Sequence, residues 1–194
     1  MLLLFLACAP SDELPPLAEI DVRMVESGRW SLAEGAVLEQ GAAGLVLEHG
    51  GRVRLLAAEV LGTPAQSDDG RRLVVSHRDD GLTISALDVV EISADGITQR
   101  RLVSEGSPDR AAISEDGEWV AFVSGQTGVA SVWAVPFDGG APQQLTNIGL
   151  EDAPRVPGGP PPGFVPPPHD GSLSVQGDEV WWVSPVGQHR VWLP

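Results

Sequence analysis

Residues 114–124 read Ser-Glu-Asp-Gly-Glu-Trp-Val-Ala-Phe-Val-Ser, and residues 174–184 read Ser-Val-Gln-Gly-Asp-Glu-Val-Trp-Trp-Val-Ser. A third copy, Ser-Asp-Asp-Gly-Arg-Arg-Leu-Val-Val, occupies residues 67–75. Each copy is a polar segment with glycine followed by a run of apolar residues, which is typical of a turn that leads into a buried β-strand. The chain is therefore expected to repeat one strand unit.

The repeated unit extends beyond its first strand. Further predicted strands follow the copies at residues 82–87, 130–135 and 190–193, and related segments continue two copies at 95–102 and 138–145. A weaker unit at residues 35–56 precedes them. Repeats of about 40–50 residues with several short strands are typical of propeller blades, because one small sheet buries both faces only between neighbours. The sequence predicts an all-β fold, a small β-propeller of about four blades, complete or incomplete.

The two ends of the chain suggest how such a propeller closes. The last copy stops after its third predicted strand, whereas residues 18–25 alternate like a strand that belongs to no unit. We predict that this N-terminal strand completes the last blade and places Val22 near Trp192, which would leave no open sheet edge. The expected propeller then spans residues 18–194.

One blade carries a family resemblance. Residues 107–146 contain the 114–124 stretch, Val-Trp-Ala-Val at 132–135 and Gly-Gly-Ala-Pro-Gln-Gln-Leu-Thr at 139–146. This segment resembles the TolB-type propeller repeat, a relative of the WD-type repeat, and the other units match it more weakly. The resemblance implies a binding protein whose partners are envelope proteins, including peptidoglycan-associated lipoproteins.

The composition argues against nucleic-acid binding. The formal net charge is −15, and none of the 12 basic residues is a lysine. Phosphate backbones are bound by clustered Lys and Arg side chains, so DNA and RNA are not expected as partners. With 194 residues, of which 42% are hydrophobic, the chain is long enough for one domain with its own core.

The first residues have the pattern of a targeting segment. Residues 1–8 are apolar and end at the only cysteine, Cys8. The Leu6-Ala7-Cys8 end resembles a bacterial lipoprotein signal, which implies lipidation of Cys8, a periplasmic location and, because Ala9 follows, an outer-membrane anchor. Residues 9–17 are then a short extended tether. The alternative is an uncleaved N-terminus with an idle cysteine.

A proline-rich insertion at residues 153–170 separates the third copy from the last. Its prolines exclude a helix or a central strand and favour polyproline II geometry. The insertion is either a docking segment or lid, or an inter-blade connection that Phe164 and Val165 pin to the surface. Phe164 and Val165 are candidate partner-binding residues.

The sequence contains little that indicates catalytic chemistry. The chain has no Gly-x-Ser-x-Gly, His-Glu-x-x-His or phosphate-loop motif, and it has no cysteine pair, so no cofactor or metal is expected. Its histidines, at 49, 77, 169 and 189, are scattered over separate units. The pairs Asp68-Asp69 and Asp79-Asp80 precede glycine, as turn residues do. The strand-end serines Ser76, Ser124 and Ser184 recur with the repeat, and none has a neighbouring base in the sequence.

The aromatic residues fall mainly in predicted strands and are expected to pack between sheets, Trp192 among them. Adjacent Trp181 and Trp182 must point to opposite faces of one strand, so Trp181 is also a candidate for a binding surface. The expected function is a non-catalytic, envelope-associated binding or scaffolding propeller. The alternatives are a periplasmic hydrolase or lyase, or the propeller part of a prolyl-oligopeptidase-like hydrolase without its catalytic domain.

Overall fold

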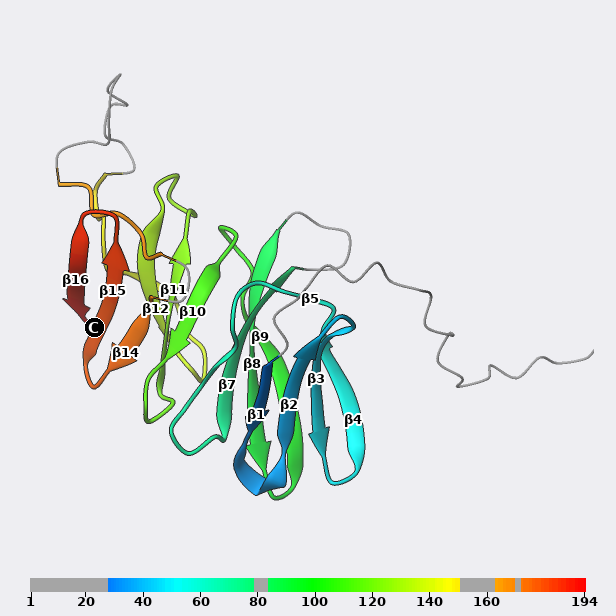
Figure 1. Cartoon of the computed structure of the whole chain (residues 1–194). Helices are drawn as coiled ribbons and strands as arrows, with labels where there is room; N and C mark the ends of the chain where they lie inside the picture. The colour runs from blue at the N-terminus through cyan, green and yellow to red at the C-terminus, as the bar shows by residue number, and fades with distance from the viewer. Residues whose placement is uncertain (1–27, 79–83, 151–162, 170–171) are drawn as a thin grey trace, which may run out of the picture.

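The computed structural model describes residues 28–78, 84–150, 163–169 and 172–194. Over these ranges the chain forms four antiparallel sheets and one short 3-10 turn, η1 (Ala33–Gly35). The sheets stand side by side in chain order (Figure 1). The prediction of an all-β fold is confirmed, and the four sheets are the blades of a small propeller.

Each blade is built from consecutive strands. Blade 1 contains β1 (Gly28–Ser31), β2 (Val37–Gly41), β3 (Gly44–His49) and β4 (Arg52–Ala57). Blade 2 contains β5 (Glu59–Val60), β6 (Ala65–Gln66), β7 (Arg72–Arg78), β8 (Ser85–Ser93) and β9 (Gly96–Val103). Blade 3 contains β10 (Asp109–Ile113), β11 (Trp119–Ser124), β12 (Ser131–Pro136) and β13 (Gln143–Gln144). Blade 4 contains β14 (Ser174–Gln176), β15 (Glu179–Ser184) and β16 (Gly187–Trp192).

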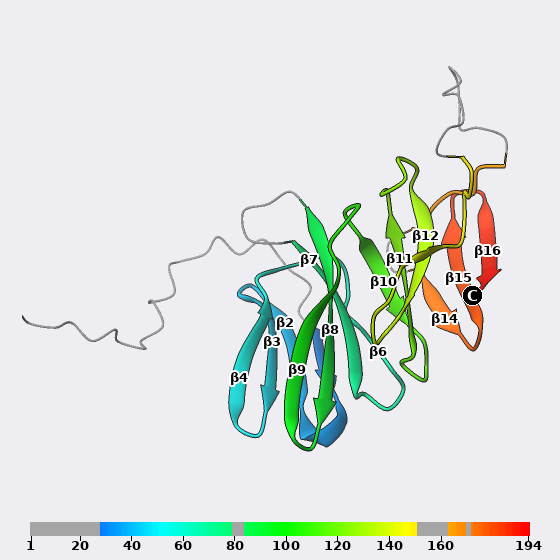
Figure 2. The same ribbon diagram turned by 180° about the vertical axis from the view of Figure 1, so that it is seen from behind.

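Three hydrophobic clusters fill the three seams between neighbouring blades. They include Leu47 with Leu73, Val74 with Phe122, and Ala121 with Trp182, in order along the row. Blades 1 and 4 lie at opposite ends of the row (Figures 1 and 2), and no cluster of described residues joins them. The described blades thus form an open row. The closing strand predicted at residues 18–25 lies outside the described residues.

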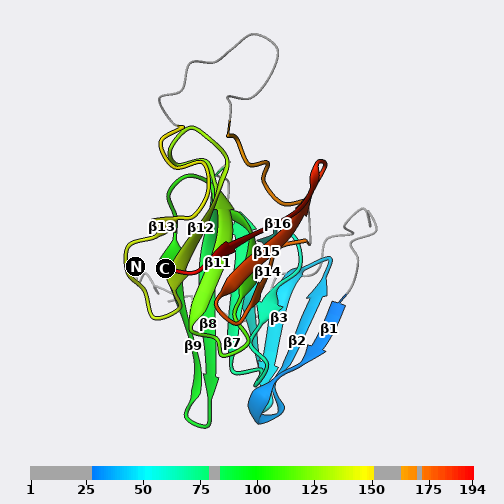
Figure 3. The ribbon, with the colours of Figure 1, turned by 90° about the vertical axis from the view of Figure 1, so that its left-hand side faces the viewer.

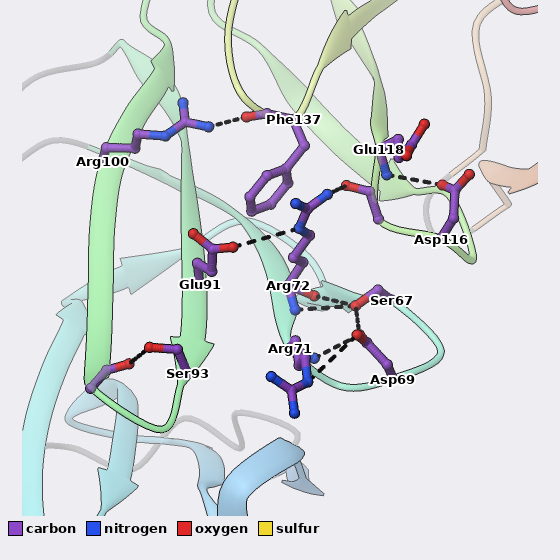
Figure 4. Close-up of polar contacts among 12 residues, drawn as sticks. Ser67, Asp69, Arg71, Arg72, Glu91, Ser93, Arg100, Asp116, Glu118 and Phe137 are labelled. Atoms are coloured by element: carbon purple, nitrogen blue, oxygen red, sulfur yellow. Dashed lines mark hydrogen bonds and ion pairs between the residues drawn. The ribbon is translucent and has the colours of Figure 1, made fainter.

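The turn that opens the repeat is the same before β7 and before β11. Ser67 Oγ donates to Asp69 Oδ1 at 2.7 Å and accepts from the Arg72 backbone N–H at 3.1 Å (Figure 4). Ser114 Oγ donates to Asp116 Oδ1 at 2.6 Å, and the Trp119 N–H donates to Ser114 Oγ at 2.9 Å.

These serine hydrogen bonds hold the pKa of both carboxyls below their usual value. Asp69 Oδ1 also accepts from the Arg71 N–H, so it is a turn residue as predicted. Asp79 and Asp80 lie outside the described residues.

The turn before β11 also contacts blade 2 directly. Gly117 has a φ of +74°, and a Cβ there would lie 2.7 Å from Arg72 Cδ. Arg72 Nη1 donates to the Gly117 carbonyl at 3.1 Å, and its guanidinium lies 4.8 Å from the centre of the Phe137 ring. Glycine is therefore required here both for the turn and for the close approach of Arg72.

The copy at residues 174–184 shares the strand but not the turn. Gln176 pairs directly with Glu179, which leaves a two-residue turn, because Gln176 stands where the other copies have the serine-binding aspartate. In the second unit the predicted strand at 82–87 begins at Ser85 and continues to Ser93 as β8. Strand β1 was not predicted, and its Trp30 packs on the core of blade 1.

Candidate functional site

The side chains on the end of the row form one exposed sheet face. In blade 4, Glu179 pairs with Trp192, Trp181 with Arg190, and Val183 with Gln188. Residues that face each other, and every second residue along a strand, share a side of the sheet. We call this set the blade-4 face: Glu179, Trp181, Val183, Gln188, Arg190 and Trp192. Figure 3 views the row from this end, with β14, β15 and β16 in front.

The repeat shows that this face occupies the position of a blade seam. Trp181 corresponds to Ala121 in β11 and to Val74 in β7, which are 0% and 1% exposed because the following blade covers them. In the described part of the chain no blade follows blade 4. Trp192 is consequently 65% exposed and Val183 47% exposed. The prediction that Trp192 packs between sheets is wrong for the described residues.

The blade-4 face combines aromatic surface with an arginine. The Arg190 guanidinium lies 5.4 Å from the centre of the Trp181 ring, and Arg190 Nη1 lies 3.3 Å from Glu179 Oε1. A hollow of about 360 Å³ opens beside Trp181, Val183 and Gln188. Trp and Arg are the residue types that contribute most often to binding energy in protein interfaces.

The opposite side of blade 4 is buried against blade 3. Trp182 is buried in the seam, stacks on His189 with 5.2 Å between ring centres, and donates from Nε1 to the Pro166 carbonyl at 3.0 Å. The prediction that Trp181 and Trp182 point to opposite faces is confirmed.

The described end of the proline-rich insertion is tied to the same seam. The Asn147 side chain donates to the Val165 carbonyl at 2.9 Å and accepts from the Val165 N–H at 2.7 Å. Arg110 Nη1 donates to the Pro168 carbonyl at 2.6 Å. These contacts favour the inter-blade connection over the lid for residues 163–169.

The predicted partner-binding residues are not brought together. Phe164 and Val165 are half-buried, and Val165 packs with the cluster that contains Trp182, whereas Trp181 lies on the other face of β15. A groove of about 350 Å³ follows this seam between Asn147, Val165 and His189. Of the three residues, only Trp181 belongs to the blade-4 face.

The strand-end serines include one that does contact a base. Ser184 Oγ lies 2.7 Å from His189 Nε2, because the β15–β16 hairpin brings these residues together. Ser184 has no neighbouring base in the sequence, and the hairpin supplies one from five residues away. A serine and a histidine five residues apart across a predicted hairpin were the signal that sequence reasoning missed.

The repeat indicates a structural role for this pair. Counted from the shared turn, the equivalents of Ser184 are Ser124 in blade 3 and His77 in blade 2, so Ser76 does not belong to the series. Ser184 is buried, and its Oγ also accepts from the Val186 N–H at 3.3 Å. Ser124 Oγ likewise donates to the Gly106 carbonyl at 3.0 Å, so both serines bind loop backbone at the end of a strand.

In blade 2 the equivalent position holds a buried ionic cluster. His77 Nε2 lies 3.3 Å from Asp88 Oδ2, Arg101 Nε lies 2.5 Å from Asp88 Oδ1, and Gln99 donates to Asp88 Oδ2 at 2.9 Å. Burial alone raises the pKa of Asp88, but the hydrogen bonds from His77, Arg101 and Gln99 outweigh it and lower the pKa to about 2. The hydrogen bond to Asp88 raises the pKa of His77 against the effect of burial.

This cluster is part of the seam between blades 1 and 2. Gln99 Nε2 also donates to the Leu56 carbonyl of β4 at 3.1 Å, so the cluster spans both sheets. Across the described ranges, no group of three or more His, Cys, Asp and Glu side chains is arranged to hold a metal ion. No helix in those ranges is long and apolar enough to cross a membrane.

Comparison with known proteins bears on the fold of this chain and not on its function. The chain matches no known family model. Over 73 residues it is 30% identical to an uncharacterized protein of Agrobacterium fabrum, a match that covers 37% of this chain and 25% of that protein.

Solved structures are similar in fold. An oligogalacturonate lyase in complex with manganese matches with a TM-score of 0.52 and 16% identity, over 83% of this chain and 46% of the lyase chain. TolB from Acinetobacter baumannii matches with a TM-score of 0.49 and 16% identity, over 80% of this chain and 37% of that chain. The chain thus spans less than half the length of these proteins, and at such identities the likeness concerns the fold alone.

Proposed function

We propose that this chain is a non-catalytic propeller of the bacterial envelope that binds another protein through the blade-4 face. The observation that carries the proposal is the exposure of Trp192, beside Trp181 and Arg190, on a face that is a buried seam in the other blades. Exposed apolar patches of this kind mark interaction sites on soluble proteins.

The chemistry of the face supports a protein partner rather than a small substrate. Its hollow is bordered by Trp181, Val183 and Gln188, and its charges, Arg190 and Glu179, pair with each other. Such a face supplies apolar contact area with a polar rim, which is the composition of protein interfaces.

The envelope location rests on the sequence at residues 1–17. Acylation of Cys8 would hold the propeller at a membrane through the tether at residues 9–17. Mass spectrometry of the N-terminus from native envelopes should find an acylated Cys8, and Cys8→Ala should move the protein to the soluble fraction. An unmodified Met1 N-terminus would contradict this part of the proposal.

Site-specific photocrosslinking tests the binding role. A photoreactive residue at Trp192 should crosslink a protein in native envelopes, whereas the same residue at the exposed Ile84 of blade 2 should not. Trp181→Ala should weaken the affinity of the purified pair at least about 10-fold, as expected for an interface anchor. Equal crosslinking at both positions, or none at either, would refute the binding role.

A further inference from the structure

Residues 163–169, the described end of the proline-rich insertion, lie along the seam between blades 3 and 4 and are held mainly through their backbone. Three side chains from different parts of the two blades donate to three of their carbonyls: Asn147 Nδ2 to Val165 at 2.9 Å, Trp182 Nε1 to Pro166 at 3.0 Å, and Arg110 Nη1 to Pro168 at 2.6 Å. The Val165 N–H also donates to Asn147 Oδ1 at 2.7 Å, and the His169 N–H donates to the Val183 carbonyl at 2.9 Å. The segment is thus bound as a peptide ligand is bound.

The prolines set the conformation of this segment. Residues 165, 166 and 167 each precede a proline, which restricts them to extended or polyproline II backbone. Polyproline II repeats every three residues, so the carbonyls of Val165 and Pro168 point to the same side. The donors that bind these two carbonyls, on Asn147 and Arg110, are therefore spaced by one turn of such a helix.

Apolar contact comes from one side chain of the segment. Val165 packs with the cluster that fills the seam, which includes Trp182. Aromatic-lined grooves are the usual docking sites for proline-rich segments in polyproline II conformation. Since the other bonds go to main-chain carbonyls, the site requires an apolar residue followed by prolines rather than one exact sequence.

The two residues that bind the ends of the segment have unusual backbones. Asn147 has a φ of +56° and Arg110 a φ of +47°, and they are two of the four non-glycine residues with positive φ in the described ranges. Arg110 also lies at an irregularity of β10, where the pairing with β11 shifts between Asp109 and Ala112. Such conformations cost free energy and cluster at functional sites. Their presence at both ends of the segment points to a binding role.

The indole donor is not part of the repeat. Phe122 in β11 and Val75 in β7 stand where β15 has Trp182, and neither of these side chains has an N–H group. Packing of the seam needs only an apolar residue at this position, as the other two blades show. The indole N–H of Trp182 is thus an addition, and it occurs at the seam where the insertion lies.

We propose that this seam is a recognition site for an extended proline-rich segment of a partner protein, and that residues 163–169 fill it as an internal ligand that the partner displaces. A partner segment with an apolar residue before its prolines satisfies the same donors, because they bind main-chain carbonyls. The site is separate from the blade-4 face, since Trp182 and Trp181 point to opposite sides of β15. The inference therefore goes beyond the proposed function and does not rest on it.

NMR spectra of the full chain test whether the site binds such a segment. In an opened variant, Val165→Ser, Pro166→Gly, Pro167→Ser and Pro168→Gly together remove the apolar contact and the polyproline II backbone. The indole N–H signal of Trp182, assigned by its loss in Trp182→Phe, should move away from its wild-type position. An unlabelled peptide Gly-Phe-Val-Pro-Pro-Pro-His should return the signal to that position in a saturable titration.

Fluorescence anisotropy of the labelled peptide compares the affinities. Wild-type protein should bind it at least about 10-fold more weakly than the opened variant, because its own segment competes at a high effective concentration. In the opened variant, Trp182→Phe keeps a ring in the seam without its N–H and should weaken binding about 3- to 10-fold, as expected for one lost hydrogen bond. Trp133→Phe is the matched control, because it removes an indole N–H that donates to the Ser124 carbonyl at 3.3 Å, and it should leave the affinity unchanged.

A second peptide, with alanines in place of the three prolines, tests the polyproline II geometry. It should bind at least about 10-fold more weakly, because it is not held in the bound conformation beforehand. Equal binding of both peptides would overturn the proposal, and so would a folded opened variant whose Trp182 signal does not respond to peptide. Urea unfolding checks that this variant folds. If it does not, the wild-type protein is titrated instead, and it should still bind the proline peptide more tightly than the alanine peptide. A wild-type dimer that excess peptide dissociates would make a second copy the occupant and overturn the assignment to a partner protein.

Discussion

Strands β11 and β15 belong to copies of the same sequence repeat but have different surroundings. Phe122 and Trp182 occupy equivalent positions toward the preceding blade, and both are buried. Ala121 and Trp181 occupy equivalent positions toward the following side, where Ala121 is buried under blade 4 and Trp181 is half-exposed. The comparison shows that the repeat determines the strand, whereas its neighbours determine which of its faces are available for binding.

The largest expected effect tests the equivalence of the buried faces. Phe122→Ala and Trp182→Ala should each lower the free energy of unfolding by about 3–5 kcal/mol, because each leaves a large cavity in a seam. Urea unfolding of purified protein measures both. A loss below about 1 kcal/mol for Trp182→Ala would mean that the seam between blades 3 and 4 is not a packed core.

The ionic cluster of blade 2 should make its seam sensitive to pH. The pKa of Asp88 is lowered to about 2, so its contribution is present above the usual value of 3.8 and is lost as pH falls from there toward 2. The pKa of His77 is raised, so its contribution is present below 6.5 and is lost as pH rises through the higher, folded-state value. The cluster thus stabilises most between these limits.

Unfolding of Asp88→Asn across this range measures the effect. Between pH 4 and pH 2 the wild type should lose on the order of 2 kcal/mol more than Asp88→Asn. Asp178→Asn, at the exposed β14–β15 turn, is the matched control and should follow the wild type. Parallel curves for wild type and Asp88→Asn would show that the cluster contributes nothing to this dependence.

The two kinds of turn should respond differently to loss of their serine. Ser114→Ala should destabilise by about 1 kcal/mol, since its Oγ bridges Asp116 and the Trp119 N–H. Ser174→Ala should change stability by less than about 0.5 kcal/mol, because the turn of blade 4 is closed by backbone pairing of Gln176 with Glu179. Thermal unfolding of both variants compares them, and equal losses would indicate that Ser174 also supports its turn.

Trp181, on the blade-4 face, is expected to contribute little to stability. Trp181→Ala should change the stability of the purified protein by less than about 1 kcal/mol, in contrast with Trp182→Ala one residue away. The same substitution should weaken binding, as described for the photocrosslinked partner. A stability loss equal to that of Trp182→Ala would place Trp181 in a core and remove the binding face.

Much of the fold could be predicted from periodicity. The Ser-x-x-Gly segments and the apolar runs after them located β7, β11 and β15, since turn chemistry and side-chain alternation are local properties. The two-residue turn at Gln176 and the extra strand β1 were missed, because one replaced aspartate changes the turn and a four-residue strand carries little pattern.

The candidate site could be predicted only in part. Trp181 was singled out because adjacent tryptophans must face opposite sides of a strand, and that reasoning needs no tertiary information. Trp192 was expected in a core, since apolar content alone does not say whether a neighbouring sheet is present. The contact of Ser184 with His189 depended on a hairpin register that the sequence left open.

The sequence by itself determined that this chain repeats a strand unit, that its turns need glycine and aspartate, and that its two tryptophans diverge. These features follow from local backbone conformation and the two-residue period of a strand. Only the tertiary structure decided which seams are filled, that the described blades form an open row, and that blade 4 exposes an aromatic face at one end of it. Burial depends on what stands beside each sheet, and that is a property of the assembled blades rather than of any one repeat.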